Sequence, residues 1–585
     1  MKLLAPFIAR FFRHRLRLLA GLLCIPVVVL CDIRITLWFG DALTRLKLRD
    51  DDAFLDGLLQ LWLLWLFVAA IQGSFRFLQR WLIVGVSRRV EVELKQELFD
   101  KLTELSLTFH NKSRSGDIVS RLTADVENVR MLLGPGSMYV LSALVFVPGS
   151  LVVLTQISPV VTFAMALPLF GVALAMKILT PKLHALSTDM QESVAEISHR
   201  AQESFAGARV IKGYGLEDHQ SEHFEKSSRA NRGAQIRFQN MRGVMHAAIH
   251  LAYDMAFLPI LFVGGWALID RSIAAGDLFK FIDLGFKVFW PVIALGWIAG
   301  LYPRALASAE RIQELLAEKN DIGDPEEPTP LDPQKIRGEL SLKGVSYTYE
   351  DAPKPAITGV DVHVPAKSLL GVVGPTGSGK TTLLNLLGRL YEPKGEIRLD
   401  DVPTQRLTLS TLRGALAYVP QDSFLFSDTY RANLSLGAEE ELTEDRLAEL
   451  IEAAGMTEEV QEFPDGLDQV IGERGVTLSG GQRQRSCIAR ALAREPRVLI
   501  LDDALSAVDT ETEARLLRSL RRAGEARTVV IAAHRLATVK GADQILALAD
   551  GKVEAQGTHE ELLERSSWYR ETWDRQRMQE ELDEL

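Results

Sequence analysis

The stretch that decides the fold lies between Leu478 and Asp509, where the chain reads LSGGQRQR at 478–485 and LILDDALSAVD at 499–509. The first block is a glycine-rich turn that exposes backbone N–H groups as it opens a helix, a geometry suited to phosphate. The second is an apolar strand that ends in two carboxylates, Asp502 and Asp503. A phosphate-binding turn close to a metal-binding carboxylate predicts a protein that uses a nucleotide.

A second glycine-rich segment supplies the phosphate loop itself. Residues 374–381, GPTGSGKT, match GxxxxGK[ST] and lie between an apolar strand at 369–373 and an apolar helix at 382–390. The loop N–H groups would surround a β-phosphate, Lys380 would neutralise β- and γ-phosphate oxygens, and the Thr381 hydroxyl would ligate Mg²⁺. This segment therefore predicts binding of ATP with Mg²⁺.

Three polar residues follow apolar strands elsewhere in the same half of the chain. Asp502 is expected to hold Mg²⁺, directly or through water. Gln421, in YVPQDSFLF, is placed to sense the γ-phosphate or the metal, and His534, in IAAHRLATV, to bond the γ-phosphate. Taken singly, Gln421 or His534 could equally be a satisfied structural group. Their order around the phosphate loop favours the functional interpretation.

The 585 residues are enough for several domains, and apolar residues are unevenly distributed among them. Residues 1–318 carry long apolar runs, residues 319–335 form a linker rich in proline and acids, and residues 336–585 are typical of a soluble α/β domain. The net charge of −10 argues against nucleic acid as the main partner. The three cysteines form no CxxC pair, which indicates no disulfide framework.

The first domain is predicted to cross a membrane six times. Each span must fill a hydrocarbon core of roughly 30 Å, and the candidates are 18–40, 57–78, 136–156, 159–180, 243–269 and 277–301. The first is interpreted as a retained signal anchor. Lys and Arg are concentrated in the two long stretches between spans, which predicts a cell (inner) membrane protein with both termini in the cytoplasm. Each long stretch has a break suited to a short transverse helix, at 115–117 in the first and at Gly207 and 213–215 in the second.

The motifs together resemble those of one family. The phosphate loop, Gln421, LSGGQ, Asp502, the SAVD of 506–509 and His534 follow the order and spacing found in half-transporters of the ATP-binding-cassette (ABC) exporters. The likeness covers nearly the whole chain, and LSGGQ separates this family from helicases and GTPases that share the phosphate loop. It implies six membrane helices in the type IV ABC exporter fold, followed by an α/β P-loop domain built on a mainly parallel sheet.

The resemblance also assigns roles to residues. Tyr349 matches the aromatic residue that stacks on adenine, residues 472–475 match the segment that touches the transverse helices, and residues 115–118 and 211–214 resemble the coupling regions. The residues expected to bind ATP are Tyr349, Gly374, Thr376, Gly377, Ser378, Gly379, Lys380, Thr381 and Thr382. Those expected to hold Mg²⁺ are Thr381, Gln421 and Asp502, and those expected to act in catalysis are Asp503, His534 and Gln421.

In this family two nucleotide domains close head-to-tail, so that each ATP lies between one phosphate loop and the other chain's LSGGQ. The signature residues are therefore expected to contact ATP held by a second half-transporter; they are Ser479, Gly480, Gly481 and Gln482. A lone copy of the chain is expected to form no complete site.

One residue departs from the family pattern. The catalytic base that follows the Mg²⁺-binding Asp is usually Glu, and here it is Asp503. The shorter side chain withdraws the carboxylate by roughly 1 Å, and misplacement of that size can cost about a hundredfold in rate. The interpretation favoured here is a heterodimer of multidrug type, in which this chain's own ATP site is slow. The alternative is that the backbone adjusts and Asp503 works in a homodimer.

Polar residues in the spans are the candidates for substrate contact, because polar groups in a bilayer are costly. His250 and Asp254 share a face of the fifth span with His246, and Asp283 and Lys287 share a face of the sixth with Lys280. The alternative is that Asp283 and Lys287 form an i,i+4 ion pair and Lys280 snorkels to the surface. Asp32 and Arg34 lie about 200° apart on the first span, so only one of them can face a cavity.

The predicted function is ATP-driven efflux of lipophilic compounds or lipids by alternating access. The predicted partners are a second half-transporter, membrane lipid and a small lipophilic substrate, with no nucleic acid. Two alternatives remain: a homodimeric lipid or peptide exporter, and a non-transporting regulator or channel subunit gated by ATP.

Overall fold

The computed structural model describes residues 2–46, 52–438, 440–472, 475, 477–508, 510–524 and 527–583. The chain divides into two compact units, a helical unit of Met1–Thr103 with Ser115–Ala317 and an α/β unit of Glu104–Arg114 with Glu318–Leu585. Residues 104–114 thus group with the α/β unit, although they fall inside the predicted membrane domain of residues 1–318. The boundaries of the membrane domain, linker and nucleotide domain at 318/319 and 335/336 remain predictions.

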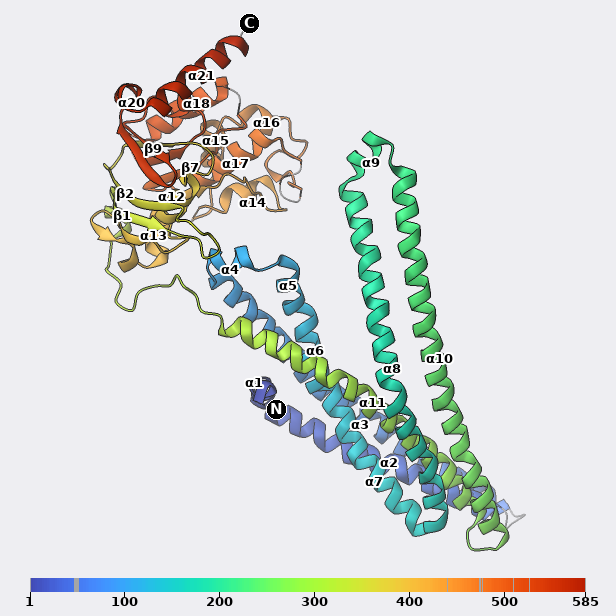
Figure 1. Ribbon diagram of the computed structural model, residues 1–585. Helices are drawn as coiled ribbons and strands as arrows, with labels where there is room; N and C mark the ends of the chain where they lie inside the picture. Colours follow the sequence, from blue (N-terminus) through green and yellow to red (C-terminus); the bar gives the residue numbers. More distant parts are fainter. Residues whose placement is uncertain are drawn as a thin grey trace. The chain divides into compact units, whose positions relative to one another are not determined.

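The helical unit consists of long helices joined by short turns (Figure 1). The long helices are α2 (Arg15–Leu46), α3 (Asp52–Glu104), α7 (Ser137–Ile157), α8 (Pro159–Ala206), α10 (Glu217–Ile269) and α11 (Ala275–Ala317). The shorter ones are α1 (Ala5–Arg13), α5 (Ser115–Ser120), α6 (Val126–Met131) and α9 (Ala208–Tyr214), with π-helical segments η2 (Arg121–Asp125) and η3 (Leu132–Gly136).

Among the described residues, four helices are long and apolar enough to cross a membrane, namely Arg15–Thr44, Leu59–Glu104, Ser115–Ile157 and Ala275–Ala317. They contain three of the six predicted spans and all but the first two residues of a fourth, 57–78. The other two predicted spans, 159–180 and 243–269, lie in α8 and α10. Part of the stretch between the first two predicted spans, residues 41–56, falls outside the described residues.

Turn chemistry explains where the membrane helices reverse direction. α7 ends at Ile157, and Ser158 is extended and acts as N-cap of α8, its hydroxyl accepting from the Val161 N–H at 3.5 Å. Pro159 then occupies the first helical position, where its missing N–H costs nothing. Ser158 alone therefore joins α7 to α8, between the predicted spans 136–156 and 159–180.

The interior of the helical unit is formed chiefly by α2, α7 and α11, with single contributions from α3 and α10 and two from α8. Ile33, Phe146, Phe281 and Leu284 are among its buried residues, and the last two are fully inaccessible. α8 and α10 run side by side as a hairpin closed by α9 (Figure 1), with Asn231 donating to the Ser193 hydroxyl at 3.2 Å. Packing rather than helix propensity therefore holds these elements in place.

The two predicted breaks turn out differently. In the second stretch, α9 lies between Gly207 and Gly215, as expected, and Gly215 supplies the left-handed cap. In the first, Ser115 to Asp117 are already helical, in α5. The short helix instead precedes them, as α4 (Leu107–Lys112), so the predicted position of this break is wrong by a few residues. Ser113, extended at the end of α4, is the residue that interrupts the helix.

The α/β unit contains two sheets. The larger has the strand order β10-β9-β3-β8-β7-β6, and all its pairs are parallel except that of the edge strand β10 with β9. Its strands are β3 (Leu369–Val373), β6 (Leu416–Val419), β7 (Val498–Asp502), β8 (Thr528–Ala532), β9 (Gln544–Ala549) and β10 (Lys552–Gly557). β3, β7 and β8 are buried throughout, as expected for parallel strands covered on both faces. The predicted mainly parallel sheet is confirmed.

The smaller sheet is antiparallel, with the order β2-β1-β4-β5. Its strands are β1 (Leu340–Tyr347), β2 (Ile357–Val364), β4 (Lys394–Leu399) and β5 (Val402–Pro403). The α/β unit also has the helices α4, α12 (Lys380–Leu387), α13 (Leu409–Ala415), α14 (Tyr430–Ser435), α15 (Glu444–Ala453), α16 (Thr457–Gln461), α17 (Gly480–Ala493), α18 (Thr510–Gly524), α19 (Leu536–Val539), α20 (His559–Arg565) and α21 (Ser567–Asp583).

Candidate nucleotide and transport sites

The predicted nucleotide residues meet at one edge of the larger sheet. β3, β8, β7 and β6 are neighbours and run parallel, so their carboxyl ends lie at the same edge. The phosphate loop follows β3, His534 follows β8, Asp502 and Asp503 come at the end of β7, and Gln421 follows β6. Open α/β sheets bind their ligands at this edge.

Glycine is required in the phosphate loop by both conformation and space. Gly377 and Gly379 have φ values of 82° and 100°, which favour glycine. A Cβ at Gly374 would lie 2.5 Å from the Ser378 hydroxyl, and one at Gly379 the same distance from the Ala356 carbonyl oxygen. The Ser378 hydroxyl is buried and has no hydrogen-bond partner in the described part of the chain. A phosphate oxygen would satisfy it, so the loop fits the predicted ligand.

Lys380 is buried inside its own loop. The ammonium donates to the carbonyl oxygens of Gly374 at 2.9 Å and Pro375 at 3.1 Å. Burial lowers its pKa, and the nearby carboxylates of Asp503 and Asp502 oppose that effect. A phosphate would give this desolvated cation a full counter-charge, which carbonyl oxygens cannot supply.

Asp502 is 2% exposed and accepts two hydrogen bonds. Thr381 donates to Oδ1 at 3.1 Å and Tyr418 donates to Oδ2 at 3.2 Å. Burial raises the pKa of Asp502, because its charged form is desolvated, while these two hydrogen bonds act in the opposite direction. A divalent cation beside Thr381 and Asp502 would compensate that charge, so the pair fits the predicted Mg²⁺.

Tyr418 was missed by sequence reasoning. Its burial and its bond to Asp502 raise the pKa of its phenol far above the ordinary range, so it remains a hydrogen-bond donor. The available signal was its place in β6, on the strand beside β7. Two strands that pair in parallel bring such residues together.

Asp503 sits on a constrained piece of backbone. Its φ is +49°, in the left-handed region. Its N–H donates to the Ala532 carbonyl at 3.0 Å, and its carbonyl accepts from the Ser506 hydroxyl at 2.9 Å. Gln484 donates to the same carbonyl at 3.4 Å. These bonds fix the backbone of Asp503 against β8 and against α17.

The other two predicted catalytic residues are exposed at the sheet edge. Gln421 follows β6, and the His534 side chain lies beyond β8. The backbone around His534 is held by the side-chain amide of Gln576 in α21, which donates to the His534 carbonyl at 2.9 Å and accepts from the Leu536 N–H at 2.8 Å. The C-terminal helix thus fixes the loop that carries the histidine.

Tyr349 belongs to a cluster of three tyrosines with Tyr347 and Tyr391. Its ring meets theirs edge to face, with centroids 5.0 and 5.4 Å away. Its hydroxyl is 3.1 Å from the Thr382 hydroxyl at the start of α12. The ring therefore lies beside the phosphate loop, where the predicted stacking on adenine requires it.

The signature forms the N-terminus of α17. Ser479 is the N-cap, and a capping box joins it to Gln482: the Gln482 N–H donates to the Ser479 hydroxyl at 3.2 Å, and the Ser479 N–H donates to the Gln482 side chain at 2.9 Å. Ser479 is exposed, and Gly480 is half-buried. A helix N-terminus open to solvent suits an anion from outside the chain.

Two predicted segments cannot be fully placed. Residues 473 and 474 of the 472–475 segment lie outside the described residues, as does Asp509. The rest of the SAVD segment contacts α17, since Gln484 donates to the Ser506 hydroxyl at 3.2 Å and accepts from the Ala507 N–H at 3.0 Å.

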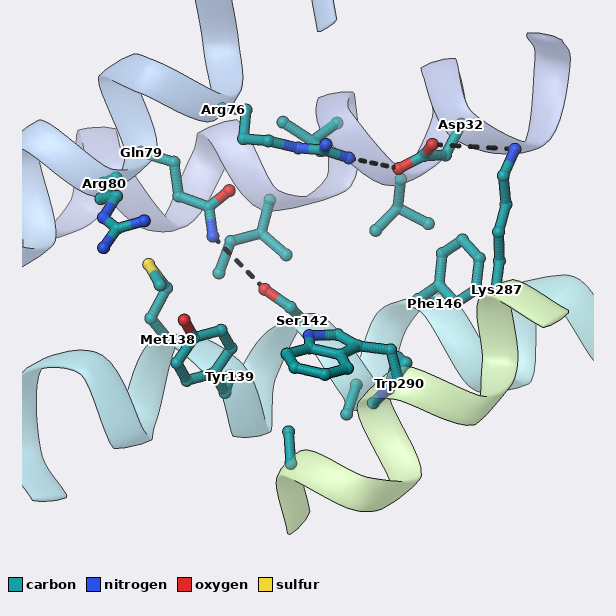
Figure 2. Close-up of a pocket in the computed structure, with 16 residues that line it drawn as sticks. Asp32, Arg76, Gln79, Arg80, Met138, Tyr139, Ser142, Phe146, Lys287 and Trp290 are labelled. Atoms are coloured by element: carbon teal, nitrogen blue, oxygen red, sulfur yellow. Dashed lines mark hydrogen bonds and ion pairs between the residues drawn. The ribbon is translucent and has the colours of Figure 1, made fainter. Parts of the chain in front are cut away.

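The helical unit contains a cavity of about 510 Å³ between α2, α3, α7 and α11 (Figure 2). Its polar residues are Asp32, Arg76, Gln79, Arg80, Tyr139, Ser142 and Lys287, and its wall is otherwise apolar. Arg76 pairs with Asp32 at 2.9 Å, and Lys287 lies 4.0 Å from the same carboxylate. A cavity with an apolar wall and a few polar groups is typical of a ligand site.

Only one of the four predicted substrate residues, Lys287, lines this cavity. Asp283 does not line the cavity. It pairs with Lys287 at 2.8 Å, which is the i,i+4 pair of the alternative interpretation. His250 and Asp254 are exposed on α10. Lys280 does not snorkel: it is 7% exposed and pairs with Asp41 at 2.6 Å and Asp277 at 2.9 Å.

The first span supplies one of its two candidate residues to the cavity. Asp32 lines the cavity and Arg34 does not, in agreement with the opposed directions expected for them. Arg76 and Arg80, one helical turn apart on α3, were not predicted. Arg76 lies near the end of the predicted span at 57–78, and Arg80 lies just beyond it, in the long stretch whose Lys and Arg residues indicate a cytoplasmic location.

A phosphate loop, a buried aspartate at the end of the neighbouring strand and an LSGGQ helix, joined to a unit of membrane-length helices, define an ATP-binding-cassette transporter. The chain belongs to this family. Residues 18–292 match the ABC transporter transmembrane region, and residues 357–506 match the ABC transporter domain.

Relatives of known description narrow the class to exporters. The multidrug resistance-like ATP-binding protein MdlA of Escherichia coli is 35% identical over 519 residues, 88% of this chain and 87% of the relative. The ATP-dependent lipid A-core flippase of Nitrosococcus oceani is 31% identical over 513 residues, 88% and 85% of the two chains. The solved structure of a bacterial Atm1-family ABC exporter with ATP bound is similar with a TM-score of 0.77 at 26% identity, covering 96% of this chain and 98% of that one. The predicted exporter fold is confirmed.

Proposed function

We propose that this chain is one half of a heterodimeric ATP-driven exporter of lipophilic compounds or lipids, and that its own ATP site is the slow one. The observation that carries the proposal is Asp503, which stands where the family pattern has Glu, beside an intact LSGGQ. The LSGGQ of this chain would contact the ATP held by its partner and complete a competent site there, while its own phosphate loop retains ATP.

The constraints on the Asp503 backbone support this proposal over a compensating shift. To restore the lost reach of roughly 1 Å, the backbone would have to move toward the phosphate loop. Such a move would weaken the bond of its N–H to Ala532, at 3.0 Å, and that of its carbonyl to Ser506, at 2.9 Å. Each such bond contributes about 1 kcal/mol.

Each remaining residue has a defined task in the proposed site. Tyr349 stacks on adenine, Ser378 and the loop N–H groups bind phosphate, and Lys380 neutralises its charge. Thr381, Asp502 and Gln421 would hold Mg²⁺, which offsets charge on the phosphates. His534 contacts the γ-phosphate.

ATP held between the two chains would close the nucleotide domains and open the transport cavity outward. Ser479 to Gln482 act on the partner's ATP, where hydrolysis chiefly resets the cycle. The proposed orientation, with both termini in the cytoplasm of a cell (inner) membrane protein, rests on the Lys and Arg residues in the long stretches between spans.

The ATPase activity of the single chain and of the assembled pair tests this proposal. The chain purified alone should hydrolyse ATP feebly. In the pair, Ser479→Ala should reduce activity far more than Asp503→Asn, since only Ser479 serves the fast site. Strong ATPase activity of the single chain would contradict the heterodimer.

A homodimeric lipid exporter is the second candidate. It is supported by the 31% identity to a protein described as an ATP-dependent lipid A-core flippase. Affinity purification from native membranes separates the two candidates, because the heterodimer brings a second, different half-transporter and the homodimer brings only this chain.

A further inference from the structure

The cavity in the helical unit continues into a second one of about 450 Å³, and the two share a positively charged residue. Arg80 lines both, together with Tyr139 and Trp290. Two more arginines, Arg88 and Arg130, line the second cavity. Among the residues that the structure describes, Asp32 in the first cavity is the only acidic residue that lines either one.

In the first cavity the other charges are balanced. Asp32 pairs with Arg76 at 2.9 Å and lies 4.0 Å from Lys287, whose ammonium also pairs with Asp283 at 2.8 Å. Two cations therefore face two carboxylates. Figure 2 shows dashed lines from Asp32 to both cations and none to Arg80.

In the second cavity, both of the further arginines pair with carboxylates behind its wall. Arg88 pairs with Glu91 at 2.7 Å, and Arg130 lies 3.4 Å from the same carboxylate. Arg130 also pairs with Glu127. Glu91 in addition binds Lys95 at 2.8 Å, so this group holds no spare negative charge.

Arg80 is thus the one cation lining the two cavities that has no ion-pair partner within the described ranges. It is exposed, so its guanidinium is open to a ligand. A guanidinium is always charged and binds carboxylate or phosphate groups through two parallel hydrogen bonds.

The surface around Arg80 is aromatic and apolar. Trp290 is 68% exposed, and Tyr139 meets Trp297 edge to face with ring centroids 6.3 Å apart. Met138 completes this part of the wall. These groups suit the hydrophobic body of a ligand whose charged end reaches Arg80.

We propose that the transported compound is an amphiphile with a single negative head group, held by Arg80 with its apolar body against Tyr139 and Trp290. The proposal rests on the export function above and specifies its substrate class. Lipophilic cations are disfavoured, because they would bring a like charge to an unpaired arginine. A free amphiphile and an anionic phospholipid share this chemistry.

Three probes with the same body test the charge preference. A dansyl-labelled undecanoate, its neutral methyl ester and its cationic trimethylammonium-ethyl amide are titrated into the native complex in phosphatidylcholine nanodiscs, with the signal of protein-free nanodiscs subtracted. We expect the carboxylate to bind about tenfold more tightly than the ester, or about 1.4 kcal/mol, and the cation more weakly than the ester.

Variants of α3 locate the effect. Arg80→Gln should abolish the preference among the three probes, and Arg80→Lys should retain it, which shows that the fold tolerates a change at this position. Arg89→Gln is the matched control, because Arg89 is an exposed arginine of the same helix that lines neither cavity. A tenth of phosphatidylglycerol in the nanodisc should displace the carboxylate probe if lipid is the occupant, and leave it bound if a free amphiphile is.

The outcomes separate this inference from the export function. Equal binding of the three probes, or a preference for the cation, would overturn the inference. If the ester is still taken up into vesicles in an ATP-driven manner, the proposed export function stands. A preference that survives Arg80→Gln would also overturn the inference. Failure of every probe both to bind and to be transported would overturn the cavity as the substrate site as well.

Discussion

At Gly481 a single missing side chain allows the signature to contact the turn after β7. A Cβ there would lie 2.7 Å from the Ala507 carbonyl oxygen, a distance that real Cβ atoms do not adopt. Gln484, one helical turn away, bonds the same segment through the Ala507 N–H at 3.0 Å. The signature, which is proposed to act on the partner's ATP, is therefore packed against the segment that positions Asp503.

Replacing this glycine should uncouple the signature from its support. Gly481→Ala must displace either the start of α17 or the Ala507 turn, and we expect the ATPase activity of the pair to fall by about tenfold or more, as for other misplaced catalytic groups. Nucleotide binding by the chain's own phosphate loop should persist. The first effect is measured as the ATPase rate of the pair. The second is measured as binding of a fluorescent ATP analogue to the single chain.

The control is Gly414→Ala in α13, where a Cβ would meet open space. That substitution should leave activity unchanged and stabilise the chain by about 0.4–1 kcal/mol. Unchanged activity in Gly481→Ala would contradict the packing argument.

At the scale of elements, the short helix α4 joins the nucleotide site through tyrosines. Asn111 donates to the Tyr391 hydroxyl at 2.8 Å, the Tyr391 ring meets Tyr349, and Tyr349 reaches Thr382 at the start of α12. Burial raises the pKa of Tyr391, which therefore stays a neutral phenol. The short helix that precedes the predicted coupling region at 115–118 thus contacts residues that are expected to bind ATP.

Asn111→Ala should weaken this connection. The loss of one hydrogen bond of about 1 kcal/mol should lower the stimulation of ATPase activity by transport substrate more than it lowers basal activity. Lys112→Ala provides the comparison, since it removes only an exposed ion pair with Glu350, which contributes little. Equal effects of the two substitutions on substrate stimulation would show that the Tyr391 contact carries no coupling.

At the scale of the whole molecule, a buried histidine joins the two C-terminal helices of the α/β unit, α20 and α21, to each other. His559 is 4% exposed, its Nδ1 lies 2.8 Å from the Tyr569 hydroxyl, and its ring meets Trp573 with centroids 4.7 Å apart. Burial lowers the pKa of His559 below its ordinary value of 6.5. The folded state therefore binds fewer protons than the unfolded state.

This difference predicts acid sensitivity. The stabilisation is complete above the ordinary pKa of 6.5 and is lost as the pH falls below it, because protonation then favours unfolding. Between neutral pH and about pH 5.5, the midpoint of thermal unfolding should fall more for the natural chain than for His559→Gln. His363→Gln, at an exposed histidine, should behave like the natural chain. Parallel curves for all three proteins would contradict this role of His559.

The nucleotide site could be predicted from sequence because its parts are local. A phosphate loop, an apolar strand ending in Asp502 and a capped LSGGQ helix each form within ten or so residues, and parallel strands bring their ends to one edge. Tyr418 and Gln576 could not be predicted in the same way. Their roles depend on which strand neighbours β7 and on where the last helix packs.

The membrane cavity shows the opposite case. Polar residues in apolar spans were visible in the sequence, but their directions depend on how separate helices pack. Of the predicted substrate residues only Lys287 lines the cavity, while Arg76, near the end of the second predicted span, and Arg80, just beyond it, line it as well. The sequence by itself thus determined the class of protein and its nucleotide chemistry, because those are set by short motifs. Only the tertiary structure decided which charges remain unpaired in the cavity, because ion pairs form between helices far apart in the chain.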